Sequence, residues 1–294
     1  MAQLVILPAS TERSESNRME VRLGDRILTF EKSRVMGILN VTPDSFSDGG
    51  RFLGPETAFE QAASMSSQGA DIIDVGGEST RPGAAELPTQ QELDRILPVI
   101  EAITARLDVA VSVDTSKSAV MQAAVKSGAV LVNDIFALRR DGALQTVAGL
   151  NVSVCLMHMQ GTPQTMQVQP HYEELPAEVM EFLVVRVRAC RDAGIEPGRM
   201  IVDPGFGFGK NDQHNLKILA NLGQFRDLKL PILVGLSRKR ILGNLTGKAA
   251  DQRVAAGVAA AVIAVSNGAN IIRTHDVGPT VDALRVFDAV RQSR

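Results

Sequence analysis

Cysteine is scarce in this chain. Only Cys155 and Cys190 occur among 294 residues, and no Cys-x-x-Cys spacing exists. Two cysteines provide neither a disulfide framework nor a cysteine-rich metal cluster, so a reducing, cytoplasmic setting is the simplest expectation. The sequence also lacks the His, Cys and carboxylate spacing of a zinc site. It has no Gly-x-Ser-x-Gly motif and no Cys and His arrangement that would indicate a covalent nucleophile.

An excess of either charge is also lacking, because 31 Lys and Arg stand against 33 Asp and Glu. This balance argues against nucleic acid or a membrane surface as a partner. The longest apolar stretch, Val254 to Val265, is well short of the roughly 20 residues that cross a bilayer. The N-terminal run Leu4 to Ala9 has no basic residue before it. We therefore expect residues 1–18 to be a disordered leader rather than a signal peptide, and residues 19–294 to be one domain.

Apolar, β-branched runs recur eight times from Val35 onward and alternate with longer helical patterns. The runs begin near residues 35, 71, 109, 130, 152, 200, 231 and 270, with helical segments such as 55–68, 91–106 and 175–193 between them. This alternation requires a parallel sheet with right-handed crossovers. Eight units over about 250 residues, in runs too apolar for burial on one side only, favour an α/β fold closed into a single (β/α)8 TIM barrel over an open doubly wound sheet.

Three segments outside the strand pattern carry further expectations. Residues 20–30 read as an N-terminal β-hairpin around Gly24 and Asp25, which could plug one end of the barrel. The loop after Met159 begins Gln-Gly-Thr-Pro, and we expect it to be exposed. The alanine-rich helix near residues 251–266 has small side chains that allow close packing, either against the barrel or, on weaker grounds, against a second subunit.

The first run ends in Asn40 and opens into a loop of helix breakers and small hydroxyls that extends to Gly50. One such loop is most often an ordinary surface connection, but here polar residues end every predicted strand. In a closed parallel barrel these ends share one rim, where barrel enzymes keep their active sites. The rim residues are Asn40, Gly76-Gly77-Glu78, Asp114-Thr115, Asn133-Asp134, His158, Asp203, Ser237-Arg238-Lys239, and Arg273 with His275.

The chemical types on this rim indicate what it binds. Asp114 and Asp203 follow apolar strands, where a carboxylate needs donors from a partner to offset its desolvation. Together with Asn133 and Lys239 they suit a flat nitrogen heterocycle with an amino-pyrimidinone edge. For each acid singly, capping a helix or pairing with a nearby cation is about as plausible. Their convergence on one rim favours the binding site.

Arg273, His275 and Asn40 come from the eighth and first strands, which are neighbours in a closed barrel. Arginine and imidazole suit an oxyanion, and an asparagine carbonyl is a hard oxygen ligand for Mg²⁺, which commonly bridges to phosphate oxygens. The ligand group implied is a phosphate or diphosphate.

The stretch Asp203 to Lys210, DPGFGFGK, fits neither a Walker A loop nor Gly-x-Gly-x-x-Gly. Its glycines are more plausible as places where the backbone approaches a planar ligand, with Phe206 or Phe208 lining the pocket. His158 fits a core position, and Met157 fits either the core or a position facing the ligand. His171 and His214 are expected only to touch solvent.

With these residues in view, the chain resembles the bacterial dihydropteroate synthase family from Arg34 to its last helix. The resemblance rests on eight motifs in order: GILNVTPDSFSDGG, DVGGESTRPGA, SVDTSK, VNDI, MHMQGTP, DPGFGFGK, GLSRK and RTHDV. It departs in Thr274, between Arg273 and His275, and in Phe136-Ala137 after VNDI. Neither departure removes a functional group.

The resemblance implies a folate-pathway barrel that joins 6-hydroxymethyl-7,8-dihydropterin diphosphate to p-aminobenzoate with Mg²⁺, as a cytoplasmic homodimer and a sulfonamide target. Diphosphate would leave first, and the arylamine would attack the resulting cation. Implied pterin contacts are Asp114, Asn133, Met157, Asp203, Gly235 and Lys239. Implied diphosphate contacts are Asn40, which also binds the metal, Thr80, Arg273, Thr274 and His275. Implied p-aminobenzoate contacts are Thr80, Pro82, Phe208 and Ser237, and Asp44, Arg81 and Lys239 are implied in catalysis.

Two alternatives remain. A methyltransferase of the related pterin-binding barrels would share the pterin residues but would not need Asn40, Arg273 and His275. A catalytically silent pterin-binding subunit would be expected to lose residues of the first loop, and none is missing. The sequence therefore favours the synthase.

Overall fold

Eight parallel strands form the centre of the molecule, in a computed structural model that describes residues 19–42, 54–79 and 83–293. Their order in the sheet is β8-β7-β6-β5-β4-β3-β10-β9, and a parallel bridge from Val202 to Ile232 joins the two ends. The predicted closed barrel is confirmed. The strands are β3 (Arg34–Asn40), β4 (Ile72–Gly76), β5 (Ala110–Asp114), β6 (Leu131–Asp134), β7 (Ser153–Met157), β8 (Met200–Asp203), β9 (Leu233–Val234) and β10 (Ile271–Thr274).

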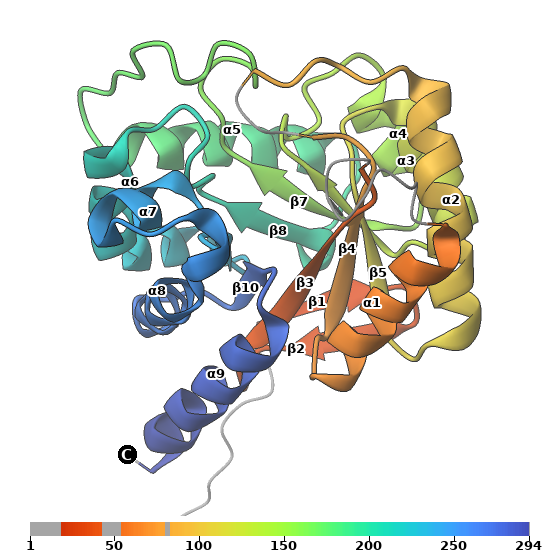
Figure 1. The fold of residues 1–294 in the computed structure, drawn as a ribbon. Coiled ribbons are helices and arrows are strands. Elements are labelled where there is room, and N and C mark those ends of the chain that lie inside the picture. The colour runs from red at the N-terminus through yellow and green to blue at the C-terminus, as the bar shows by residue number, and fades with distance from the viewer. Residues whose placement is uncertain (1–18, 43–53, 80–82, 294) are drawn as a thin grey trace, which may run out of the picture.

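Helices pack around these strands (Figure 1). In α2, Ile96, Val99, Ile100 and Ile103 repeat at the spacing of one helix face, and all four are fully buried. The main core accordingly lies between the strands and the helical layer. The helices are α1 (Pro55–Ser67), α2 (Thr89–Arg106), α3 (Ser118–Lys126), α4 (Ala143–Gly149), α5 (Ala177–Asp192), α6 (Asp212–Ala220), α7 (Arg240–Thr246), α8 (Val254–Ser266) and α9 (Val277–Gln292).

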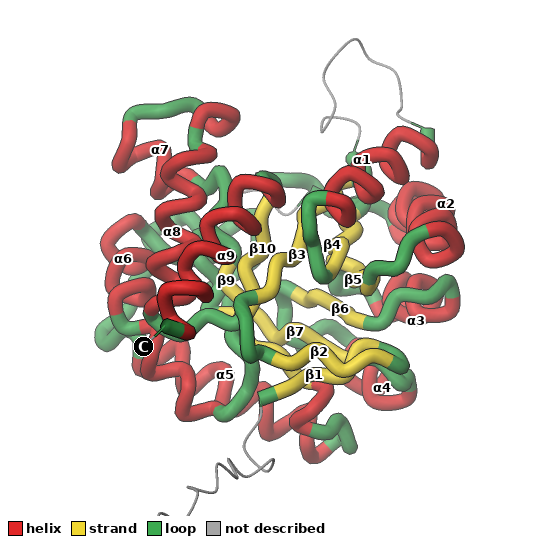
Figure 2. Tube along the Cα trace, turned by 90° about the horizontal axis from the view of Figure 1, so that it is seen from below, coloured by secondary structure: helices red, strands yellow, loops and turns green. Residues whose placement is uncertain are grey.

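A hairpin closes the end of the barrel at which the strands begin. Its strands are β1 (Glu20–Leu23) and β2 (Arg26–Thr29), as predicted, and they lie across that end in Figure 2. Val21 and Leu23 pack against a ring to which every barrel strand contributes one inward side chain, so the expected plug is confirmed. That ring consists of Met36, Ile72, Ala110, Leu131, Cys155, Ile201, Leu233 and Ile271.

The next inward position on each strand lies two residues further along, because side chains alternate between the two faces of a strand. This second ring contains three buried polar side chains besides an arginine and a serine, so the interior changes from apolar to polar within one step. The barrel therefore presents a charged floor towards the rim. The second ring consists of Ile38, Asp74, Ser112, Asn133, Met157, Asp203, Gly235 and Arg273.

Candidate functional site

The floor of the site is an ion network that joins strands from opposite sides of the barrel. Arg273 donates from Nε to Asp74 Oδ2 at 2.6 Å and from a terminal nitrogen to Asp114 Oδ2 at 2.7 Å. Asn133 Nδ2 donates to the same Asp74 oxygen at 2.9 Å. Asp74 is fully buried, so its charge requires these donors. Residues from β4, β5, β6 and β10 are thus fixed relative to one another.

Burial sets the electrostatics of this floor. It raises the pKa of Asp114 to about 7, against the opposing charge of Arg273 and with a further contribution from Asp74. Burial acts to lower the pKa of Arg273, but the charges of Asp74 and Asp114 raise it above its ordinary value. Arg273 is therefore always a cation here, and the two carboxylates share it.

A second cation, Lys239 from the loop after β9, interacts electrostatically with a third carboxylate, Asp203 at the end of β8. Asp203 Oδ1 accepts from the backbone N–H of Gly205 at 2.7 Å, and burial raises the pKa of Asp203. Lys239 donates to the carbonyl of Phe206, and its ammonium lies 4.7 Å from the centroid of the Phe208 ring. Burial lowers the pKa of Lys239 to about 8, although Asp203 opposes the shift.

Gly205 is required by the loop after β8. Its φ is +71°, and a Cβ atom there would lie 1.9 Å from the carbonyl oxygen of His158. Behind the loop, the fully buried Lys210 donates to His158 Nδ1 at 2.8 Å and to the carbonyls of Gly205 and Phe208 at 3.0 and 3.1 Å. Burial lowers the pKa of Lys210 well below its ordinary value. Lys210 and His158 therefore shape the loop from inside.

A cavity of about 180 Å³ extends from Asp114 between the loops that follow β4, β5, β6 and β7. Its apolar lining consists of Ala84, Ile135, Phe136 and Pro163. Ile135 also belongs to a buried cluster with Met157 and Met159, against which Phe208 packs. An apolar wall facing a charged floor suits a flat, polar heterocycle, because such a ring has two apolar faces and a hydrogen-bonding edge. Polar lining residues of the cavity are Glu78, Ser79, Glu86, Asp114, Thr115, Ser116, Arg140, Thr162 and Gln164.

On the rim, Asn40 and Asp114 flank Gly76, since a Cβ atom on that glycine would lie 3.8 Å from Asn40 Oδ1 and 3.4 Å from Asp114 Cβ. Ser237 Oγ accepts from the backbone N–H of His275 at 3.1 Å and lies 3.1 Å from His275 Nδ1. Polar side chains after β3, β9 and β10 thus gather at the same end of the barrel as the floor.

Comparison with known proteins identifies this arrangement. The family model "Pterin binding enzyme" matches residues 36–275. The dihydropteroate synthase of Escherichia coli K12 is 49% identical over 267 residues, which cover 91% of this chain and 95% of the relative. The chain belongs to the dihydropteroate synthase family.

Solved structures of this family agree in fold. The Yersinia pestis dihydropteroate synthase in a sulfonamide drug complex superposes with a TM-score of 0.90 at 48% identity, covering 93% of this chain and all of that one. The Xanthomonas albilineans dihydropteroate synthase in complex with 7,8-dihydropteroate gives 0.85 at 47% identity, covering 92% and 98%.

The structure brings together the residues expected to hold the pterin of dihydropteroate synthases. Asn133, Met157, Asp203 and Gly235 occupy the second ring. Asp114 contacts that ring through Arg273, and Lys239 interacts electrostatically with Asp203, Arg273 and Asp114. Their individual roles in the family reaction stay predictions.

Two other predicted residues are engaged by protein groups. The guanidinium of Arg273, predicted at the diphosphate, pairs with Asp74 and Asp114 on the floor, and its diphosphate role stays a prediction. The Thr274 hydroxyl faces α9, where it accepts from the backbone N–H of Asp276 at 3.1 Å and from Thr280 Oγ1 at 3.4 Å. Successive side chains of a strand point to opposite faces, so Thr274, which follows the inward Arg273, points out of the barrel.

Several expectations lie outside the described residues. They are the leader 1–18 and the site residues Asp44, Thr80, Arg81 and Pro82. Among the described residues, His214 departs from the expectation that it only touches solvent. It completes a capping box with Asn211 at the start of α6, because its ring accepts from the Asn211 backbone N–H.

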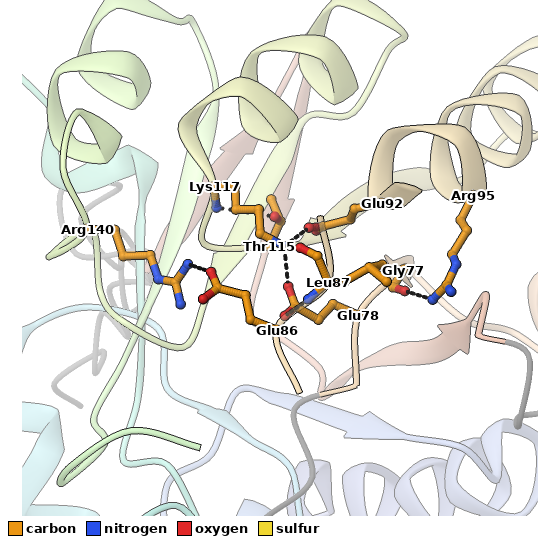
Figure 3. A network of polar contacts seen from close by, with 9 residues as sticks. All are labelled: Gly77, Glu78, Glu86, Leu87, Glu92, Arg95, Thr115, Lys117 and Arg140. Carbon is orange, nitrogen blue, oxygen red and sulfur yellow. Dashed lines mark hydrogen bonds and ion pairs between the residues drawn. The ribbon is translucent and has the colours of Figure 1, made fainter. Parts of the chain in front are cut away.

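A cluster that the sequence reading did not single out holds the loop after β4 (Figure 3). Lys117 donates to Glu78 at 2.6 Å, to Glu92 at 2.7 Å and to the carbonyl of Leu87 at 2.7 Å. Glu78 also accepts from the Leu87 backbone N–H at 3.0 Å. Burial acts to lower the pKa of Lys117, but the hydrogen bonds to Glu78 and Glu92 raise it above its ordinary value. Lys117 thus clasps together Glu78 and Leu87, which flank this loop, next to the cavity.

The sequence reading also missed Asp74, Ile135 and Lys210. Asp74 had a usable signal: an acid inside the apolar run IIDVG, in the inward phase of the strand. Ile135 follows Asn133 by two residues and has the same inward phase. The role of Lys210 had no such signal, because its partners are backbone carbonyls and a histidine 52 positions away.

Proposed function

We propose that this chain joins 6-hydroxymethyl-7,8-dihydropterin diphosphate to p-aminobenzoate, giving 7,8-dihydropteroate and diphosphate. The observation that carries the proposal is the second ring: carboxylates, an amide and an arginine converge on one polar floor beside an apolar wall, in a chain of the dihydropteroate synthase family. Asp114, Asn133, Asp203 and Lys239 hold the polar edge of the pterin. Met157, Gly235 and Phe208 line its faces.

The reaction begins with heterolysis of the bond between the pterin methylene carbon and the diphosphate oxygen. The electron pair leaves with diphosphate, the arylamine nitrogen then forms the new C–N bond, and the nitrogen loses one proton. The carboxyl groups of Asp74, Asp114 and Asp203 lie on the floor with Arg273 and Lys239. Carboxyl oxygens at this place stabilise the cationic methylene. Asp44 and Arg81 complete the catalytic set.

The diphosphate and the second substrate occupy the rim. Asn40, Thr80, Arg273, Thr274 and His275 bind the diphosphate, Thr274 through its backbone because its hydroxyl is engaged with α9. The p-aminobenzoate contacts are Thr80, Pro82, Phe208 and Ser237.

Mg²⁺ fits Asn40, a hard oxygen donor on the rim, as part of a site completed by substrate. The described residues include no group of three His, Cys, Asp or Glu side chains able to hold a metal. When bound beside Asn40, Mg²⁺ would supply neutralisation of the charge on the departing diphosphate.

The protein acts as a cytoplasmic homodimer in this proposal, with α8 in the interface. This helix is rich in alanine, and its Ile263 side chain is 48% exposed. Among the described residues, no helix has the length and apolar character needed to cross a membrane. Light scattering should report a dimer, and Ile263→Glu should shift it to monomer while Val168→Glu, at another exposed apolar residue, should not. A wild-type monomer would refute this part.

Purified protein incubated with the dihydropterin diphosphate, p-aminobenzoate and Mg²⁺ should release diphosphate. Omission of p-aminobenzoate should abolish dihydropteroate formation, and a chelator should abolish turnover until excess Mg²⁺ is restored. Tight pterin binding without turnover would replace the synthase by a silent pterin-binding subunit.

A further inference from the structure

Asp74 is a fully buried carboxylate that lies one inward step above the apolar ring. One oxygen, Oδ2, accepts from both Arg273 and Asn133. The other, Oδ1, is buried and has no hydrogen-bond partner among the described residues. A charge with this burial is costly, and an apolar residue would fill the position at lower cost. The position therefore calls for an explanation beyond packing.

The contact with Asn133 fixes which way its amide points. A carboxylate only accepts hydrogen bonds, so the amide nitrogen must face Asp74. The carbonyl oxygen of Asn133 is then turned to the opposite side of the amide. The site consequently presents an acceptor at this position instead of a donor, which selects a ligand edge that carries an N–H group.

The contact with Arg273 fixes the plane of its guanidinium. The Nε bond to Asp74 and the terminal bond to Asp114 together hold the group in one orientation. Asp74 also neutralises much of the arginine charge. Without that charge on Asp74, Arg273 would have Asp114 as its remaining partner and would compete with a ligand for that carboxylate.

We propose that Asp74 is a positioning residue of the pterin site, which sets Asn133 with its carbonyl oxygen towards the ligand and keeps Arg273 from monopolising Asp114. The proposal rests on the proposed function for the identity of the ligand. It predicts that Asp74 governs pterin affinity and leaves the p-aminobenzoate side of the site unaffected.

The test compares Asp74→Asn with Asp71→Asn. Both replace an aspartate that pairs with an arginine of another barrel strand, but Asp71 lies at the beginning of the strand and pairs with Arg34 at 2.9 Å, far from the rim. Calorimetric titration with the dihydropterin diphosphate should show about a ten- to hundredfold weaker Kd for Asp74→Asn, the loss expected for a charge-assisted contact. Asp71→Asn should bind like wild type. In steady state, the KM for p-aminobenzoate should be unchanged in both.

A spectroscopic readout reports the positioning itself. In protein labelled with ¹⁵N-arginine, the Arg273 Nε–H resonance, assigned through Arg273→Lys, should move and exchange faster with solvent in Asp74→Asn, and should stay in place in Asp71→Asn. A double-mutant cycle with Asn133→Ala should be non-additive for the pterin Kd, because Asp74 acts through Asn133.

Unchanged pterin affinity in folded Asp74→Asn, or an equal rise in both KM values, would overturn the proposal. Should Asp74→Asn fail to fold, Asp74→Glu keeps the charge but displaces it, and must still weaken the pterin Kd for the proposal to stand. The titration separates this inference from the proposed reaction. Wild-type protein that binds pterin without turnover would refute the proposed reaction, and the effect of Asp74→Asn on the pterin Kd would still test the role of Asp74.

Discussion

Replacement of Lys239 by methionine should make the protein more stable while it destroys activity. The ammonium is driven from a pKa of 10.5 to about 8 by burial, which corresponds to a cost of about 3 kcal/mol. Because the side chain is only half-buried, we halve the expected gain, and loss of the bond to the Phe206 carbonyl removes up to about 1 kcal/mol more. The free energy of unfolding at pH 7 should therefore rise by about 1 kcal/mol, or roughly 2–4 °C in Tm.

The stability difference between wild type and Lys239→Met should depend on pH. Between pH 8 and 10.5 the unfolded chain binds a proton at Lys239 that the folded protein has lost. The unfolding free energy of the wild type should therefore increase with pH across this window through this side chain. The methionine variant lacks that contribution. Its advantage is fully present below pH 8 and disappears by pH 10.5.

Urea unfolding at pH 7, 8, 9 and 10 measures the difference directly. Lys126→Met, at an exposed lysine on α3, controls for the loss of one positive charge and should change stability by less than about 0.5 kcal/mol. Diphosphate release should fall by about a hundredfold or more in Lys239→Met, as for removal of a preorganised donor, and remain normal in Lys126→Met. A Lys239→Met protein that is less stable at pH 7, with the wild-type slope against pH, would refute the reasoning.

Asp114, Lys117 and Gly205 each allow a further prediction. Asp114→Asn should weaken binding of the dihydropterin diphosphate by about 1–3 kcal/mol in calorimetry, and an unchanged affinity would remove Asp114 from the pocket. Lys117→Met should lower the unfolding free energy by about 3–5 kcal/mol, since it leaves Glu92 buried without its cation, whereas Arg106→Met, which breaks the exposed pair with Glu56, should cost less than about 1 kcal/mol. Equal losses in these two variants would contradict the clasp. Gly205→Ala should cost more than about 3 kcal/mol, because the methyl group would overlap the His158 carbonyl; a Tm within 2 °C of wild type would disprove the close approach.

The barrel could be predicted from the sequence because its signals are local. Each strand is an apolar run with a polar end, and the helices between them have regular apolar spacing. The hairpin had the same kind of signal in the turn at Gly24 and Asp25. The convergence of Asp114, Asn133 and Arg273 then followed from topology, since the carboxyl ends of parallel strands share one rim.

What could not be predicted depends on which partner a side chain selects. The sequence predicted a phosphate partner for Arg273 but gave no signal for its pairing with Asp74 and Asp114 on the floor. Thr274 lies at the predicted place along the chain, but its side chain is on the outer face of the strand and not on the inner one. Lys117 reaches Glu78 and Glu92, which lie 39 and 25 positions away, and no sequence periodicity encodes such a meeting.

The hairpin that plugs the barrel is synthesised before every barrel strand. Val21 and Leu23 leave the ribosome ahead of these strands, but the cluster that covers them includes Leu233 and Ile271, from two of the last strands. Their docking surface is therefore incomplete until almost the whole polypeptide has emerged. Until then these two apolar side chains cannot be fully buried. A nascent barrel truncated before β9 should therefore depend on chaperones to keep its hairpin from associating with other chains.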